Sequence, residues 1–479
     1  MDCPKDCPNA STSQQQGSPE RQTDMAVEFH QFEGVEFPIG GQSADEIKKL
    51  TKRYVSHKKK AAAALKLYSE AASAYEADPN NAQARKLAKR LANQYRFSLR
   101  GRLVAVITQN KKLDRGRRRS LRQCFSLAKS LSAHKQSDEI VRVIFKPKAS
   151  GGQRPIQEFG LRHRSAQQLA KSIIECRMNP RDWQYTLKGV PKAIRFLKDL
   201  EPGAETWAAK LDIKDFYGHF LEADLKKLLW EVPQSVVKAT LLSKENVLMD
   251  YKGVPLAGSY LQEAHRGVAQ GSIVSPLLGA LAVSNMSWDP DEKIGCANYA
   301  DDFLLVANSK SDLDDAVHAF DLAVQAGLPG GNFHLKPSVI SQFGHGVAFL
   351  GHYLFVARDG LKVDPGGPAI TRLAERLDEL RVKTRLAIAS HKEHPSDVTR
   401  HKMLGRLASI LYYVNGWCSS FAECEKQALI VYYSESMDVL YELVAEAGVT
   451  IEEVEAAAPA PTGFHGTSSE FDDGFDVSA

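Results

Sequence analysis

The stretch CANYADDFLLVAN, residues 296–308, places two adjacent carboxylates inside an apolar run that reads as a strand. The segment IGCANY leads in and FLLVANS leads out, so we expect Asp301 and Asp302 at the tight turn of a hairpin. Burying carboxylates is costly unless they are paired or bind a metal. A plain surface turn would also explain an isolated ADD triplet, so the meaning of these acids depends on the rest of the chain.

A second strand-like segment, WAAKLDIKDFYGHF, ends at Asp212, 89 residues before Asp301. Between the two lies RGVAQGSIVSPLLGAL, which predicts a polar turn at Gln270-Gly271 followed by an apolar helix. Three strand-end carboxylates beside such a turn suit two divalent ions, which activate a 3′ hydroxyl and stabilise leaving pyrophosphate during phosphoryl transfer. Mg²⁺ is the expected ion, because it is bound through a few carboxylates together with substrate phosphates, and Mn²⁺ could replace it.

These segments follow one another in an order that resembles the reverse transcriptase family. LDIKDFYGHF is similar to its motif A, AQGSIVSPLLGAL to motif B and YADDF to motif C, while GNFHLKPSVISQF and VAFLGHYLF resemble motifs D and E. Upstream, FKPKASGGQRPI is similar to the fingers motif of group II intron and retron enzymes. The resemblance covers about Val141 to Phe355, with a fainter likeness to the intron-enzyme thumb in LYYVNGWCSSF. It implies an RNA-directed DNA polymerase, a nucleotidyltransferase that copies an RNA template into DNA from dNTPs.

The resemblance also implies a role for each matching residue. The metal-binding acids would be Asp212, Asp301 and the supporting Asp302, with the main-chain carbonyl of Ile213 as a further ligand. Tyr217 matches the steric gate that excludes a 2′ hydroxyl, although a packed core aromatic is the alternative. The remaining candidates for dNTP binding are Lys146, Lys148, Arg154, Gln270, Gly271 and Lys336, and those for the primer grip are Phe349, Leu350 and Gly351. For the three lysines, an ordinary surface charge is the competing interpretation.

Positive charge is concentrated in the N-terminal third, in KKLTKRYVSHKKK, RKLAKRLANQYRFSLRGR and KKLDRGRRRSLR. Such clusters attract polyanions, whereas a solvated helix face is the alternative for any single run. We expect RNA contact at Lys58, Lys59, Lys60, Arg117, Arg118 and Arg119. From Ile451 onward the chain has seven acids and no Lys or Arg, so residues 1–450 carry a net charge of +11.

The expected fold is of the α+β class, a right-hand polymerase with fingers, a palm built on an antiparallel sheet and a helical thumb. We expect a poorly ordered N-terminus at 1–45, a basic helical RNA-binding extension at 46–135, fingers and palm at 136–365, the thumb at 366–448 and an acidic low-complexity tail at 449–479. That tail could shield the basic surface. No apolar run reaches the roughly 20 residues of a membrane helix, and the start lacks the apolar core of a secretory signal. We therefore expect a cytoplasmic bacterial protein with no membrane partner, and a homo-oligomer stays open.

Departures from the intron and retron patterns narrow the biological role. Ser272 stands where intron enzymes have a second Gly, no endonuclease signature follows the thumb, and the VTG of retron thumbs is absent. Together with the basic extension, this is most similar to bacterial "unknown group" defence-associated reverse transcriptases, which implies antiphage defence with an associated noncoding RNA. The alternatives are a retron-like or group II intron-derived enzyme and a non-catalytic RNA-binding scaffold. An RNA-dependent RNA polymerase is disfavoured by Ala300 and the bulky Tyr217.

Overall fold

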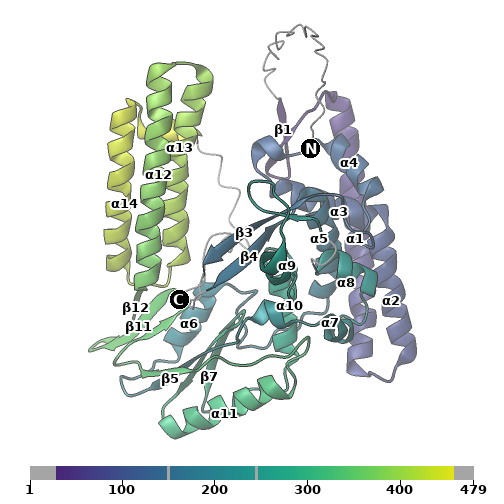
Figure 1. Cartoon of the computed structure of the whole chain (residues 1–479), viewed down its shortest axis with the longest axis vertical. Helices are drawn as coiled ribbons and strands as arrows, with labels where there is room; N and C mark the ends of the chain where they lie inside the picture. Colours follow the sequence, from purple (N-terminus) through teal and green to yellow (C-terminus); the bar gives the residue numbers. More distant parts are fainter. Residues whose placement is uncertain (1–27, 148–151, 243–245, 458–479) are drawn as a thin grey trace, which may run out of the picture.

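The computed structural model describes residues 28–147, 152–242 and 246–457. Figure 1 shows long N-terminal helices on one side, a bundle of C-terminal helices on the other, and the strands between them. The mixed α+β class expected from the sequence is confirmed. In the described part of the chain, no helix is both long enough and apolar enough to cross a membrane.

The N-terminal layer combines one hairpin with four α-helices. The hairpin consists of β1 (Phe29–Phe32) and β2 (Val35–Pro38). The helices are α1 (Ala44–Ala77), α2 (Ala82–Phe97), α3 (Leu99–Lys111) and α4 (Leu121–Ser130), with the short η1 (Arg115–Arg117) before α4. Ser43 caps α1 by accepting a hydrogen bond from the Glu46 N–H.

The hairpin corrects the expectation for the N-terminus. Phe32 and Phe37 are buried, and their rings meet edge to face with 5.6 Å between centroids. Burying two aromatic side chains fixes the hairpin against α1, where the Phe32 ring also contacts Tyr54. The prediction of poor order was therefore wrong for residues 28–45, and residues 1–27 lie outside the described part.

The middle of the chain begins with the hairpin expected around Gly151-Gly152. Strands β3 (Val141–Pro147) and β4 (Gln153–Glu158) pair antiparallel with Lys146 opposite Arg154, and the short β6 (Leu248–Met249) joins β3 in parallel. Helices α5 (Leu161–Glu175) and α6 (Val190–Asp199) lead from β4 to the central sheet.

The central sheet has the strand order β7-β8-β5-β9, with every neighbouring pair antiparallel. Its strands are β5 (Trp207–Asp212), β7 (Gly295–Tyr299), β8 (Asp302–Ala307) and β9 (Val339–Gln342). Every residue of β8 is buried, as expected for an inner strand covered on both faces. Helix α11 (Lys310–Gly327) packs on β5 and β8, as Figure 1 shows. The antiparallel sheet expected from the sequence is confirmed.

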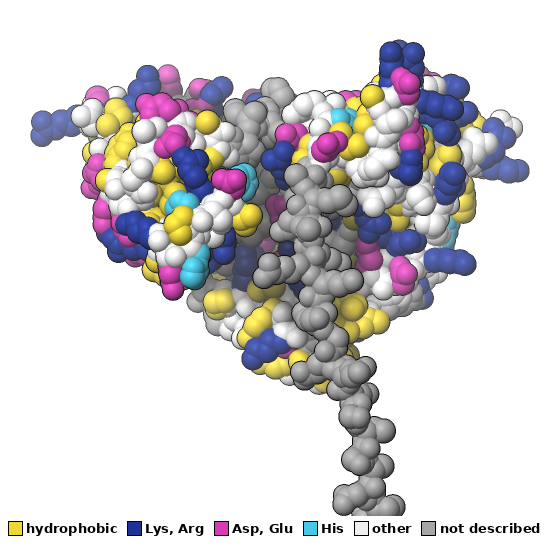
Figure 2. All heavy atoms as spheres, turned by 90° about the horizontal axis from the view of Figure 1, so that it is seen from above, with side chains coloured by type: hydrophobic (Ala, Val, Ile, Leu, Met, Phe, Trp, Pro, Cys, Tyr) yellow, Lys and Arg dark blue, Asp and Glu magenta, His cyan; other side chains and the backbone are white. Residues whose placement is uncertain are grey.

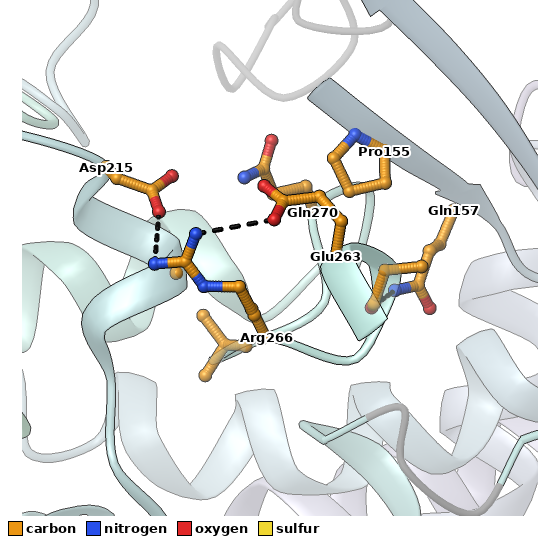
Figure 3. A pocket seen from close by; sticks show the side chains of 9 residues that line it. Pro155, Gln157, Asp215, Glu263, Arg266 and Gln270 are labelled. Atoms are coloured by element: carbon orange, nitrogen blue, oxygen red, sulfur yellow. Dashed lines mark hydrogen bonds and ion pairs between the residues drawn. The ribbon is translucent and has the colours of Figure 1, made fainter. Parts of the chain in front are cut away.

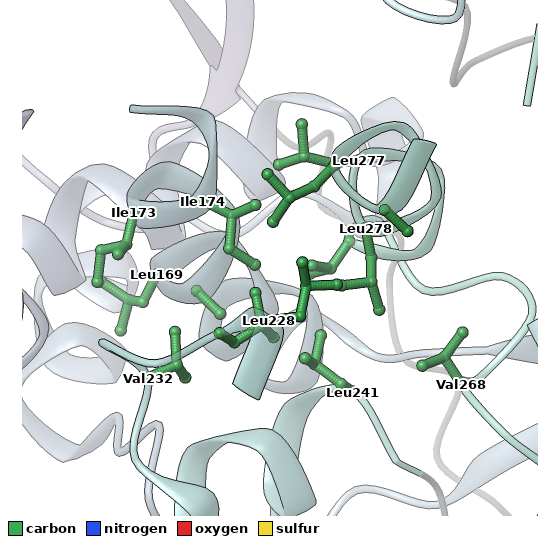
Figure 4. Packing of buried hydrophobic residues seen from close by; sticks show 14 of the residues in the cluster. Leu169, Ile173, Ile174, Leu228, Val232, Leu241, Val268, Leu277 and Leu278 are labelled. Carbon is green, nitrogen blue, oxygen red and sulfur yellow. The ribbon is translucent and has the colours of Figure 1, made fainter. Parts of the chain in front are cut away.

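A large apolar core joins the N-terminal layer to the region around the sheet (Figure 4). Leu169, Ile173 and Ile174 of α5 face Leu277 and Leu278 of α10 (Ser275–Ser284) across this core. The helices α7 (Glu222–Leu228) and α8 (Gln234–Thr240) and the 3-10 helix η2 (Phe216–His219) lie in the connection between β5 and β6, and α9 (Gly258–Ala264) follows β6. The N-terminal helices are thus packed as part of the same body.

The C-terminal part consists of a three-stranded sheet and a helical bundle. Strands β10 (Val347–Phe349), β11 (His352–Ala357) and β12 (Gly360–Pro365) precede α12 (Gly367–Glu393), α13 (Asp397–Ser420), α14 (Lys426–Ala447) and α15 (Ile451–Ala457). Helix α15 lies within the stretch predicted to be low-complexity tail, but its Val454 is fully buried and its Glu453 pairs with Arg400 of α13. Residues 451–457 of the predicted acidic tail are therefore a helix packed on the bundle, and 458–479 lie outside the described residues.

Candidate functional site

The predicted acids meet at one edge of the central sheet. Asp212, the last residue of β5, lies opposite Asp302, the first residue of β8. Because Tyr299 pairs with Asp302, the turn between β7 and β8 contains only Ala300 and Asp301. The buried Ile213 continues β5 at this edge, and its N–H donates to the Asp301 carbonyl oxygen over 3.2 Å. Two antiparallel pairings thus bring together residues that are 89 positions apart.

The turn that carries Asp301 is strained and held from outside. Ala300 has a φ of 54°, a left-handed conformation that residues with a Cβ rarely adopt. Its N–H donates to Thr186 Oγ1 over 2.8 Å, and its carbonyl oxygen accepts from Asn298 Nδ2 over 3.0 Å. The same Asn298 amide also donates to the Asp302 carbonyl oxygen. Both supporting side chains are buried.

Sequence reasoning missed these two supporting residues. Asn298 carried a weak signal, because it is a polar residue in an otherwise apolar strand. Thr186 carried none, since it follows the WQY segment far from the acids. That segment lies beside β7, where the Tyr185 N–H donates to the Asn298 carbonyl oxygen and the Asn298 N–H donates to the Trp183 carbonyl oxygen.

The electrostatics of the acids fit a divalent cation. Burial raises the pKa of Asp301, and the negative charge of Asp212 raises it further. Burial likewise raises the pKa of Asp302, with Asp301 as the next cause. Asp212 Oδ1 and Asp302 Oδ1 are buried without a hydrogen-bond partner. Unpartnered carboxylate oxygens among like charges are the donors that Mg²⁺ or Mn²⁺ would satisfy.

The three predicted acids influence one another and have neighbouring cations. Among the described residues, no group of three or more His, Cys, Asp and Glu side chains is arranged to hold a metal ion. The charge of Asp212 raises the pKa of Asp301, the charge of Asp301 raises the pKa of Asp302, and Lys210 Nζ lies 4.0 Å from Asp302 Oδ1. Lys336 Nζ donates to Asp212 Oδ2 over 2.9 Å, so this predicted residue does reach the acids.

The predicted phosphate-binding residues come from the β3–β4 hairpin. Arg154 lies close enough to Asp301 for its positive charge to lower the pKa of that carboxyl group. Lys146 is directly across the hairpin from Arg154. Lys148 lies outside the described residues.

The Gln270-Gly271 turn is joined to the same hairpin. The Gln157 N–H of β4 donates to the Gln270 carbonyl oxygen over 2.8 Å. Gly271 has a φ of 94°, and a Cβ at this position would come within 2.3 Å of the Gln157 carbonyl oxygen. Only glycine permits this close approach, so the turn and the hairpin form one wall of the site.

Tyr217 lies in η2, five residues after Asp212, beside the segment that leads into the Gln270-Gly271 turn. Its ring is half-buried beside Phe216, and its carbonyl oxygen accepts from the Val268 N–H over 2.9 Å. A small cavity next to this segment is lined by Pro155, Gln157, Asp215, Gly218, Glu263, Arg266 and Gln270 (Figure 3). Arg266 binds Asp215 over 3.0 Å and Glu263 over 3.3 Å. Asp215 itself has a φ of 46°, so this ion pair fixes a strained residue that sequence reasoning also missed.

Comparison with known families identifies this arrangement. Residues 146–354 match the sequence profile of the family described as reverse transcriptase (RNA-dependent DNA polymerase). This segment, less than half of the chain, is similar to a reverse transcriptase domain, and the family is described as RNA-dependent DNA polymerases. The match includes the three acids Asp212, Asp301 and Asp302 and the candidate substrate-binding residues Arg154, Tyr217 and Gln270.

Solved structures similar to this chain are polymerases at low identity. They include telomerase from Candida albicans in complex with a telomeric RNA fragment, at 13% identity and a TM-score of 0.31 over 68% of this chain and 64% of that one. The Sicinivirus 3Dpol RNA-dependent RNA polymerase has 14% identity and a TM-score of 0.32 over 68% and 71% of the two chains. The chain thus spans about 64% of the length of the Candida albicans telomerase chain. No curated protein matches the sequence.

The predicted primer-grip residues form the β10–β11 turn, at the end of the reverse transcriptase domain. Leu350 and Gly351 have φ values of 49° and 76°, and Phe349 pairs with His352, as in a two-residue hairpin turn with two left-handed residues. Phe349 and Leu350 are buried against the C-terminal bundle. Their side chains therefore hold the turn in place, and only the backbone of the turn is a candidate for primer contact.

The predicted RNA-binding residues divide into two groups. Lys58 pairs with Glu33 at 2.8 Å, and Arg118 donates to the carbonyl oxygens of Leu113 and Glu36. These two side chains therefore fasten the β1–β2 hairpin and its surroundings. The side chains of Lys59, Lys60, Arg117 and Arg119 are exposed.

Proposed function

We propose that this protein synthesises DNA on an RNA template at a site built on Asp212 and Asp301. The observation that carries the proposal is the pair of sequence-distant carboxylates on one sheet edge, with a buried Asp212 oxygen left unpartnered and a raised Asp301 pKa. Divalent ions, when bound there, would activate the primer 3′ hydroxyl and stabilise the leaving pyrophosphate. Asp212, Asp301 and the Ile213 carbonyl would hold them, and Asp302 would support the turn electrostatically.

The surrounding residues would bind and orient the substrates. Arg154 offers a planar guanidinium suited to bidentate phosphate contact, and Lys146 offers a second positive charge across the hairpin. Tyr217 would exclude the 2′ hydroxyl of a ribonucleotide, while Gln270 and Gly271 would pack beside the nascent base pair. Lys336, whose ammonium group donates to Asp212, would turn to the phosphates and donate a proton to pyrophosphate.

The elements would correspond to a right hand. The central sheet would be the palm, the β3–β4 hairpin with its helices the fingers, and α12 to α15 the thumb. The β10–β11 turn would grip the primer. Residues 46–135 would form the RNA-binding extension, and because the extension shares a core with the polymerase domain, bound RNA would be held at a fixed distance from the acids.

The biological role we propose is bacterial antiphage defence in the cytoplasm, with a structured noncoding RNA as partner and template. The support is the resemblance to defence-associated enzymes together with the basic extension. A retron-like or intron-derived enzyme would share the chemistry and differ in its RNA. A non-catalytic scaffold is the other candidate, and the retained acids speak against it.

The deciding experiment purifies the protein from its native host with bound nucleic acid and supplies labelled dNTPs and Mg²⁺. An Asp301→Ala, Asp302→Ala variant is compared with wild type, and Asp314→Ala on the exposed face of α11 is the matched control. DNA made by wild type and control but not by the double variant supports the proposal, and sequencing the RNA names the template. Bound RNA without DNA from any of the three proteins would favour the scaffold.

A further inference from the structure

Helix α1 carries a row of four lysines along one face. Lys48, Lys52, Lys59 and Lys66 lie within about 40° of one another around the helix axis, at 3.6 residues per turn. All four side chains are exposed. The row is about 27 Å long, at 1.5 Å per residue. The opposite face of α1 is buried through residues such as Leu50, Tyr54 and Tyr68.

Acids flank this lysine row, with Asp45 three residues before Lys48 and Glu70 four residues after Lys66, but none lies between its ends. From Lys48 to Ser69 there are eight Lys and Arg residues and no Asp or Glu. A helix face that is only solvated gains stability from Glu–Lys pairs one turn apart, whereas like charges one turn apart, such as Lys48 and Lys52, repel each other. A stretch without acids therefore has a lower helix stability in the free protein. A bound polyanion would neutralise the repelling lysines and restore that stability.

Unlike the row lysines, neighbouring Lys and Arg side chains are paired with carboxylates. Lys58 and Lys111 both bind Glu33, Arg115 binds Glu36, and Arg122 binds Glu46. These carboxylates lie on or near the β1–β2 hairpin and neutralise the side of the N-terminal layer that it covers. Within the described ranges, none of the four row lysines has an ion-pair partner. Figure 2 shows Lys and Arg side chains projecting from the outer edge of the mass on the right, the side on which Figure 1 places α1 to α4.

We propose that the lysine row binds the phosphate backbone of the RNA partner, at a surface separate from the polymerase site. RNA is the favoured polyanion because the proposed polymerase uses an RNA template, so this inference rests on the proposed function. A straight row of ammonium groups contacts phosphates without reading bases, so the row positions RNA rather than selecting its sequence. The relevant lysines are thus not the contiguous run 58–60 but those aligned by the helix, of which only Lys59 belongs to both sets.

The test replaces all four row lysines with Gln in the full-length protein and measures affinity for a long RNA hairpin over a range of salt concentrations. Each phosphate contact contributes roughly 0.7–0.9 to the slope of log K against log salt. Loss of four contacts should therefore reduce the slope by about 3. The matched control replaces Lys227, Lys238, Lys293 and Lys310 with Gln, because each of these is paired with a carboxylate and the change in net charge is the same.

An unchanged slope in the row variant would overturn the proposal, as would equal reductions in the row and control variants. Vesicles of phosphatidylserine and phosphatidylcholine provide a further arm: row-dependent vesicle binding with unaltered RNA binding would also overturn it. Extension of a short preannealed RNA–DNA primer–template reports the polymerase site separately, and the row variant should retain it. If wild type fails that assay, the proposed function fails, while the salt slope still decides the lysine row.

Discussion

The sharpest prediction concerns Thr186, whose side chain holds the Ala300–Asp301 turn through a hydrogen bond. Thr186→Val keeps the shape of the side chain but removes the oxygen that accepts from the Ala300 N–H over 2.8 Å. The N–H would lose its partner at a part-buried position, and the cost is at most about 1–3 kcal/mol, that of a fully buried group. Ala300 already stores backbone strain at a φ of 54°, commonly of about 1–3 kcal/mol, so the turn is expected to relax rather than bear both penalties.

That relaxation should appear mainly in kcat. If the 1–3 kcal/mol is lost from the productive geometry of Asp301, the rate falls roughly 5- to 150-fold, because each 1.36 kcal/mol is tenfold. The KM for dNTP should change little, since Arg154 and Tyr217 are on other elements. Thr186→Ser retains the acceptor oxygen and should restore most of the rate. The assay is steady-state primer extension, with thermal unfolding measured alongside it.

A matched control separates positioning from general stability. Thr206 is also buried, accepts from the Gly203 N–H over 3.0 Å and donates to Asn308. It precedes β5, about 20 Å from Asp212 at 3.4 Å per residue. Thr206→Val should destabilise the protein by a similar amount and leave kcat near wild type. The reasoning is refuted if both variants lose kcat equally, or if Thr186→Val works at the wild-type rate.

Three further predictions test other parts of the site. Asp301→Asn should abolish synthesis yet stabilise the protein in metal-free buffer. The folded-state pKa of Asp301 is raised, so its charge destabilises the fold increasingly as the pH rises above the ordinary value near 3.9. The gain in melting temperature should therefore disappear below that pH, and a gain that is the same at every pH would contradict this prediction. Tyr217→Ala should raise ribonucleotide incorporation relative to dNTPs, measured by competition, whereas Tyr441→Ala on the exposed face of α14 should not; equal discrimination in all proteins would mean that Tyr217 is only a packing residue. Deleting residues 458–479, which carry four acids and no Lys or Arg, should strengthen RNA binding at low salt through the lysine row, and an affinity equal to wild type would remove the shielding hypothesis.

The sequence was most informative where one short segment carries a whole feature. The YADD turn, the strand ending at Asp212 and the β3–β4 hairpin could each be recognised locally, because residue types and alternation specify them without distant contacts. The same local interpretation missed the β1–β2 hairpin, where polar composition predicted poor order, and the helix α15 in the predicted acidic tail. Those segments are ordered because Phe32, Phe37 and Val454 are buried against residues of other elements. The amino-acid composition of a segment does not reveal such contacts.

The positioning of the acids was beyond local reading because it is contributed from far along the chain. Thr186 is 114 residues from the Ala300 N–H that it holds, and Lys336 is 124 residues from the Asp212 carboxylate that it contacts. Each is an ordinary residue in its own segment and acquires its role only when the sheet brings the segments together.

The lysine row shows the converse case. The three consecutive lysines 58–60 stand out in the sequence, but successive residues of a helix are 100° apart around its axis. The lysines that can contact one straight nucleic-acid backbone together are therefore those spaced by whole helical turns. Charge clusters in a helical segment are therefore better evaluated by angle around the helix than by density along the chain.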